Sequence, residues 1–122
     1  MIVGFDKQTR DLTEYERTKL LPIMCKCFRR HIGEENAISN REICEKMTAK
    51  GYIVSEARVR KIINHIRTNA LVPCLMANGN GYYITTKPSE MSSYIQSIHG
   101  RIEALIGLKE ALEKQYMELT GS

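Results

Sequence analysis

One stretch decides the fold: Val54-Ser-Glu-Ala-Arg-Val-Arg-Lys-Ile-Ile-Asn-His-Ile-Arg67. At about 100° per residue, one side of this helix is apolar and predicts a core-facing stripe of Val59, Ile62, Ile63 and Ile66. The opposite side carries Ala57, Arg60, Lys61, Asn64, Arg67 and Thr68. A solvated surface helix and a helix that lies on nucleic acid both fit this pattern, so the neighbouring segments have to decide.

The start of this helix is signalled by two residues. Ser55 stands at the N-cap position, where its hydroxyl can accept a hydrogen bond from a free amide of the first turn. Glu56 follows, and a carboxylate in the first turn suits the positive end of the helix dipole. The helix is therefore predicted to run from Ser55 to Asn69.

Length and composition indicate one small domain with an appended helix, because the chain has 122 residues and 43% hydrophobic content. The sequence shows neither an apolar run of about 18 residues nor a signal-peptide pattern. We therefore expect a soluble cytoplasmic protein with no membrane partner. The four cysteines stand in mostly apolar surroundings, which favours reduced, buried thiols over disulfides.

The formal net charge of +4 is unevenly distributed along the chain. Residues 55–87 hold five basic and one acidic side chain, whereas residues 1–54 hold ten and eight, and residues 88–122 hold three and five. The middle segment thus concentrates positive charge, which favours a polyanionic partner.

Two capping boxes predict two helices before the opening stretch. Thr13-x-x-Glu16 opens a helix expected to continue to Ile32 and stop at Gly33, and Pro22 predicts either a kink or a later start. Ser39-x-x-Glu42 opens a short helix that ends near Lys50-Gly51. The stretch 36–38 between them is expected to form an isolated β-bridge or an edge strand. Residues 1–12 are interpreted as an N-terminal arm.

A β-hairpin is predicted after Asn69. Two strand-like runs, residues 71–77 and 82–86, flank Asn78-Gly-Asn-Gly81, and an Asn-Gly pair tolerates the positive φ that a tight hairpin turn needs. Pro73 belongs at the start of the first strand or on an edge.

Residues 88–122 predict a long C-terminal helix, with Ser89 as the expected cap and no strong stop before Gly121. Its apolar residues recur at spacings of three and four, with Lys109 in the one polar position of the series. A homodimer formed through this helix is the favoured interpretation, and a purely intramolecular helix is the alternative. The expected dimerisation residues are Ile95, Ile98, Ile102, Leu105, Leu112, Tyr116 and Leu119.

The order helix, short strand, helix, helix, hairpin resembles the winged helix-turn-helix superfamily over residues 13–87. Ser39–Lys50 corresponds to the positioning helix, Ser55–Asn69 to the recognition helix and residues 78–81 to the wing tip. The texture of the sequence is similar to small winged-helix proteins of phages and bacterial mobile elements. The expected fold class is mainly α (α+β), with residues 1–87 as the winged domain and 88–122 as the dimerisation helix.

The resemblance implies that the recognition helix enters the major groove of double-stranded DNA. Arg60 and Asn64 are then the expected base readers, because Arg suits guanine and Asn suits adenine. Phosphate contacts are expected from Lys61, Arg67 and Thr68, and backbone contacts at the wing from Asn78, Asn80 and Lys87. Ser55, Glu56 and Ala57 complete the DNA-facing set. The wing lacks the arginine that some family members carry at its tip, which argues against minor-groove reading.

No catalytic, metal or cofactor site is predicted. The side chains of Cys25 and Cys27 diverge by about 200° on a helix and lack the CxxC spacing. The three histidines, His31, His65 and His99, are scattered, and no glycine-rich phosphate loop precedes a helix. The leading hypothesis is a dimeric DNA-binding regulator or mobile-element accessory factor. A protein-interaction adaptor that docks replication or recombination partners is the alternative.

Overall fold

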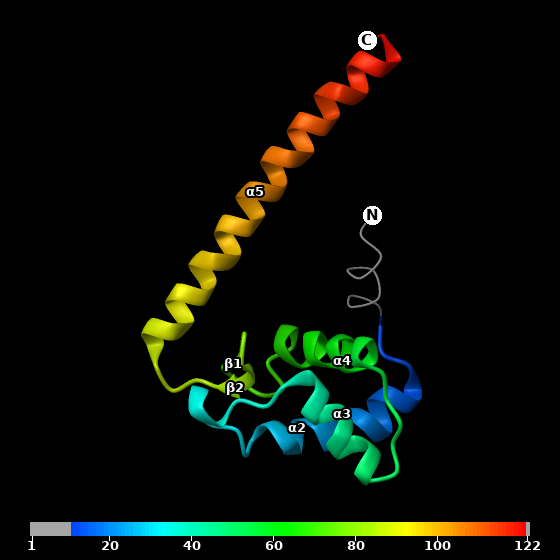
Figure 1. Ribbon diagram of the computed structural model, residues 1–122, viewed down its shortest axis with the longest axis vertical. Helices are drawn as coiled ribbons and strands as arrows, with labels where there is room; N and C mark the ends of the chain where they lie inside the picture. The colour runs from blue at the N-terminus through cyan, green and yellow to red at the C-terminus, as the bar shows by residue number, and fades with distance from the viewer. Residues whose placement is uncertain (1–10, 122) are drawn as a thin grey trace. The chain divides into compact units, whose positions relative to one another are not determined.

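The computed structural model describes residues 11–121, so most of the expected arm at residues 1–12 lies outside the described residues. The chain divides into two compact units, Met1–Thr86 and Lys87–Ser122, each described below by itself. The architecture is mainly helical with one small antiparallel sheet, as expected for an α+β chain (Figure 1).

The first helical segment begins as its capping box predicts. The Thr13 amide donates to Glu16 Oε1 at 2.8 Å, and the Glu16 amide donates to Thr13 Oγ1 at 3.1 Å. A π-helical turn, η1 (Glu16–Leu20), leads into α2 (Leu21–Phe28), which places Pro22 in the first turn of α2. The chain is helical without interruption from residue 14 to residue 28, and the π-helical turn directly precedes the proline, where a regular α-helical hydrogen-bond pattern cannot be continued.

The expectation that this helix reaches Ile32 is wrong, because α2 ends at Phe28. The chain then turns, and Ile32 forms an isolated parallel bridge with Ile84 of the hairpin. The Ile84 amide donates to the His31 carbonyl at 2.8 Å, and the Gly33 amide donates to the Ile84 carbonyl at 2.9 Å. These bonds to the sheet replace the last helical turn. A short 3₁₀ turn, η2 (Glu34–Asn36), follows.

Ile38 confirms the expected isolated β-bridge. It pairs antiparallel with Tyr82, and the two residues exchange amide-to-carbonyl hydrogen bonds of 2.8 and 2.9 Å. The close approach requires Gly81, which has φ +124°, because a Cβ there would overlap the Ile38 carbonyl. The segment before α3 is thereby fixed to the hairpin.

The helix pair α3 (Asn40–Ala49) and α4 (Glu56–Thr68) follows, with caps that confirm both sequence predictions. Ser39 and Glu42 form the reciprocal capping box, and Ser55 Oγ accepts from the Arg58 amide at 3.1 Å. Asn40 Nδ2 donates to the Glu56 carbonyl at 3.2 Å, which ties the start of α3 to the start of α4.

The hairpin is shorter than predicted, with strands β1 (Leu75–Asn78) and β2 (Gly81–Ile84) in register from Leu75↔Ile84 to Asn78↔Gly81. Pro73 lies before β1 rather than in it. Of the two Asn-Gly pairs at the tip, the second provides the positive φ, at Gly81. An Asx turn, in which the Asn80 amide donates to Asn78 Oδ1 at 2.8 Å, shapes the tip.

One core holds this unit together. It is built from the apolar stripe of α4, from α2 and α3, and from the hairpin, and the predicted stripe residues of α4 are all buried. The largest fully buried side chains are Phe28, Leu20, Met24, Ile38, Ile43, Ile62, Ile66, Val59 and Val72. The opposite side of α4 is not part of this core.

The second unit is a single helix, α5 (Pro88–Thr120). Ser89 is not its cap, as the sequence suggested, because the helix begins at Pro88 with Lys87 at the N-cap. Proline is favoured at the first helical position, where its missing amide has no partner to lose. The expected stop is confirmed at Gly121, which takes the left-handed conformation with φ +74°.

Candidate nucleic-acid interface

The predicted recognition residues on the outer face of α4 differ in how exposed they are. Glu56, Arg60 and Thr68 are exposed, whereas Ala57 and Asn64 are half-buried. Asn64 has a polar or electrostatic interaction within the chain. Of the two predicted base readers, Arg60 is therefore the more accessible to a ligand.

A buried carboxylate fixes the flank of this face. Glu16, whose side chain is 3% exposed, receives Arg58 Nε on Oε2 at 2.9 Å and Lys61 Nζ on Oε1 at 2.7 Å. The Arg58 guanidinium also lies 5.5 Å from the centre of the Tyr15 ring, within cation–π range. Glu16 thus links the start of η1 to the middle of α4.

The pKa of Glu16 reports the strength of this cluster. Burial alone would raise the pKa, but hydrogen bonds from Lys61, from the Thr13 amide and from Arg58 outweigh it and lower the pKa from 4.5 to about 2. The carboxylate is consequently ionised at neutral pH, where its two cations remain paired with it.

The cluster changes the expected role of Lys61. Its side chain is only 14% exposed and ends on Glu16, so it is placed as a structural cation rather than as a free phosphate contact. Arg67 is also engaged, because its Nε donates to the Leu75 carbonyl at 3.1 Å and so joins α4 to β1. Sequence reasoning missed Glu16 and Arg58, because both partners of Glu16 stand more than forty residues further along the chain.

Neutralising Glu16 should destabilise the fold. We expect Glu16→Gln to lower the free energy of unfolding by about 3 kcal/mol, because it leaves the mostly buried Lys61 ammonium without its counter-charge. Urea unfolding at pH 7 measures the loss. Glu14→Gln, an exposed neighbour, is the matched control and should change stability by less than about 0.5 kcal/mol.

The same cluster predicts a pH dependence. Because the folded pKa lies below the unfolded value of 4.5, the stabilisation is complete above pH 4.5 and disappears as the pH falls towards 2. A shift of this size corresponds to about 3 kcal/mol. Unfolding curves between pH 5 and 2 should show this loss in the wild type and lack it in Glu16→Gln. Parallel curves for the two proteins would contradict the assignment.

At the hairpin tip, Asn78 and Asn80 are both exposed and belong to the same turn. Lys87, the third residue expected at the wing, is exposed but belongs to the second unit as the N-cap of α5. The structure therefore groups the two asparagines in one turn, whereas Lys87 belongs to the other unit.

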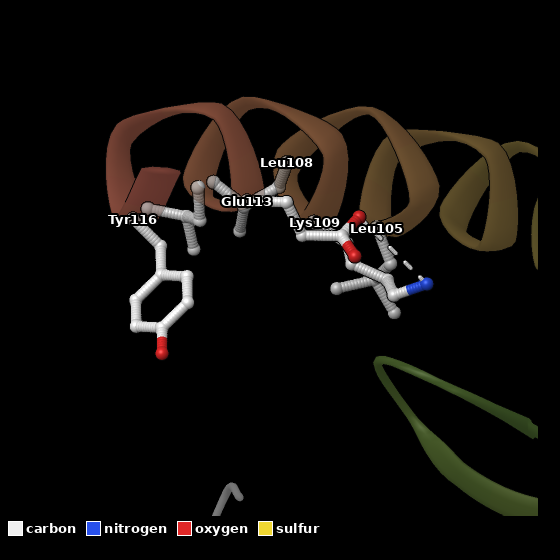
Figure 2. Close-up of a pocket in the computed structure, with 6 residues that line it drawn as sticks. Leu105, Leu108, Lys109, Glu113 and Tyr116 are labelled. Atoms are coloured by element: carbon white, nitrogen blue, oxygen red, sulfur yellow. Dashed lines mark ion pairs between the residues drawn. The ribbon is translucent and has the colours of Figure 1, made fainter. Parts of the chain in front are cut away.

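The predicted dimerisation residues share one feature: all are large apolar side chains that are exposed on α5. The seven side chains of this seam, Ile95, Ile98, Ile102, Leu105, Leu112, Tyr116 and Leu119, are 39–88% exposed. Figure 2 shows Leu105, Lys109 and Tyr116 leaving α5 on the same side, with the Lys109 ammonium 3.9 Å from a Glu113 oxygen. A helix with this much exposed apolar surface is typical of a binding element.

Metal and thiol chemistry find little support among residues 11–121. No group of three or more His, Cys, Asp or Glu side chains in this range has metal-binding geometry. All four cysteines are free thiols; Cys25 is buried, and burial raises its pKa. The expectation of buried thiols fails at Cys74, which is exposed before β1. No helix of the described residues is long and apolar enough to cross a membrane.

Comparison with protein-family models, with curated proteins and with solved structures gives no significant match for this chain. Its function must therefore be argued from its own residues.

Proposed function

We propose that residues 13–87 form a winged helix-turn-helix that binds double-stranded DNA. The order of α2, the Ile38 bridge, α3, α4 and the hairpin supports this assignment. The pairing of Ile38 with Tyr82 of β2 adds a third strand position to the hairpin, as a winged helix requires. The tie between Asn40 and the start of α4 supports α3 as the positioning helix.

The observation that carries the proposal is the exposed side of α4. Its inner side is fully buried, so the helix cannot rotate, and Arg60 projects from the outer side into solvent. In the major groove, Arg60 would donate two hydrogen bonds to a guanine, and Asn64 would read an adenine. Thr68, Asn78 and Asn80 would contact phosphates, which set the register of the protein on the duplex.

The engaged cations have a different role in this proposal. Arg58, Lys61 and Arg67 are held by Glu16 and by the Leu75 carbonyl, so they fix α4 on its domain and add positive potential beside the groove. Base reading then falls mainly on Arg60. Fewer free cations also predict a moderate salt dependence of binding rather than a steep one.

The C-terminal helix would join two such domains into a homodimer through its exposed seam. A two-fold dimer suits a pseudo-palindromic site with half-sites about one helical turn apart. This organisation is typical of a transcriptional regulator or of an accessory factor of a phage or mobile element.

A protein-interaction adaptor is the second candidate, and one observation favours it. Ile106 and Leu108 are exposed beside the seam and widen the apolar face of α5 beyond what a two-helix contact covers. A partner helix from another protein would cover that extra surface.

The proposal predicts binding to a pool of random duplexes at about 50 mM salt, where phosphate contacts are strongest. Fluorescence anisotropy measures affinity, and sequencing of retained fragments over several rounds should yield a pseudo-palindromic motif. The logarithm of affinity should fall linearly with the logarithm of salt concentration. No detectable binding at low salt would reject DNA binding and leave the adaptor function.

A further inference from the structure

A groove between α2 and α3 lies outside the surface assigned to DNA. It has a volume of about 340 Å³, within the range of small-ligand pockets. Its apolar lining includes the buried side chains of Met24, Ile43 and Met47 and the half-buried Ile23 and Cys27. Two methionines make this lining adaptable in shape, because their side chains are flexible and polarisable.

The charged residues that line the groove are all basic, namely Lys26, Arg30, Lys46 and Lys50, and His31 lies beside them. The sequence explains the imbalance, because five Lys and Arg residues and no acidic residue stand between Glu16 and Glu34. This second concentration of positive charge is not visible in the total for residues 1–54, because acidic residues elsewhere in that segment offset it. His31 is held in place, since its Nδ1 donates to the Asn36 carbonyl at 2.8 Å.

No carboxylate of α3 lines the groove, although Glu42 lies close enough to Lys46 and His31 of the rim to interact with both. Glu42 closes the capping box with Ser39, whose hydrogen bonds lower the pKa of Glu42, and Glu45 pairs with Arg41 at 3.5 Å. Neither glutamate lines the groove. The residues that line the groove thus include cations and no carboxylate, and Glu42 offsets part of the charge of Lys46 from outside the groove.

We propose that this groove binds a small amphipathic anion, a molecule with an apolar body and one carboxylate or phosphate group. The body would lie against the half-buried Ile23 and Cys27, above the buried methionines, and would itself gain from losing contact with water. The anionic head would lie among Arg30, Lys46 and Lys50, with Arg30 able to hold it through two parallel hydrogen bonds. A phosphate of DNA alone would leave the apolar lining unused. The site does not rest on the DNA-binding function.

Cys27 provides a direct measurement because its thiol lines the groove, whereas Cys74 is exposed elsewhere. The whole protein is treated with iodoacetamide, with or without decanoate or decyl phosphate, and alkylation is followed peptide by peptide. Either anion at about 1 mM should slow the modification of Cys27 roughly fivefold and leave Cys74 unchanged. Decyltrimethylammonium, with the same chain and the opposite charge, should protect neither cysteine.

Matched substitutions distinguish binding at the basic rim from a general effect of the protein's charge. Arg30→Glu should weaken protection roughly tenfold, whereas Arg29→Glu, the same charge change outside the groove lining, should leave it intact. Circular dichroism verifies that both variants fold. The proposal is overturned if decyltrimethylammonium protects Cys27 as well as the anions do, or if inorganic phosphate alone protects it as well as the amphiphiles. It is also overturned if Arg30→Glu and Arg29→Glu behave alike, or if no anion protects Cys27. Protection by one amphiphilic anion only would support the site and identify its head group.

Discussion

We expect the double substitution Ile102→Asp and Leu105→Asp to convert the protein from a dimer of twice 14.0 kDa to a monomer of 14.0 kDa. Both side chains lie in the middle of the α5 seam and are about half exposed in the single chain. Each substitution would remove an apolar side chain from the contact between the two helices. The four aspartates of the two chains would then meet where little water remains. The dissociation constant should rise by at least about 1000-fold, which corresponds to about 4 kcal/mol.

Sedimentation equilibrium across a range of concentrations measures this change. The control is Ala104→Asp with Ala111→Asp, which places the same two charges on α5 outside the seam and should keep the wild-type mass. Helix content should be compared for both variants, because α5 depends on packing for stability. A double Ile102/Leu105 variant of unchanged mass would exclude pairing through this seam. A wild-type protein that is already monomeric at high concentration would exclude the dimer itself.

The second large effect is expected at Arg60. If α4 reads DNA as proposed, Arg60→Glu should weaken DNA binding at least about 100-fold, because it removes the proposed main base reader and places a carboxylate against the phosphates and base edges. Arg60→Ala should weaken binding less, by about 1–3 kcal/mol, and should relax sequence preference at one position of each half-site. Competition between the selected site and random duplexes distinguishes lost specificity from lost charge.

Lys114→Glu is the matched control for Arg60→Glu, because it makes the same charge change at an exposed position of α5 outside the seam. It should leave affinity within about threefold of the wild type at physiological salt. Equal affinities of the Arg60→Glu variant and the wild type would remove α4 from the DNA interface. Intact binding of a protein partner by Arg60→Glu, with no DNA binding by the wild type, would favour the adaptor.

The structure also decides which residue should not be used for this test. From the sequence, Lys61 looks equivalent to Arg60, since both stand on the polar side of the same helix. Charge reversal at Lys61 would instead bring a second carboxylate against the buried Glu16. The variant would lose stability, and a loss of DNA binding could not be distinguished from a loss of folding.

Local signals explain why much of the fold is predictable. The caps at Thr13, Ser39 and Ser55 form because donor and acceptor are three residues apart, so the sequence already contains both partners. The apolar stripe of α4 is equally predictable from the sequence, since a period of 3.6 residues reveals which side of the helix faces the core. Helix ends were less predictable, because Ile32 leaves the helical path only to pair with Ile84.

The sequence by itself determined the order of elements, the buried side of α4 and the apolar seam of α5, since each depends on periodicity or on neighbouring residues. Only the tertiary structure decided which cations remain available to a ligand. Glu16 engages Arg58 and Lys61 across more than forty residues, and α2 and α3 gather five basic side chains around one groove. The physical reason is that charges pair through space, so a basic residue is free or engaged according to the carboxylate or carbonyl that folding brings to it.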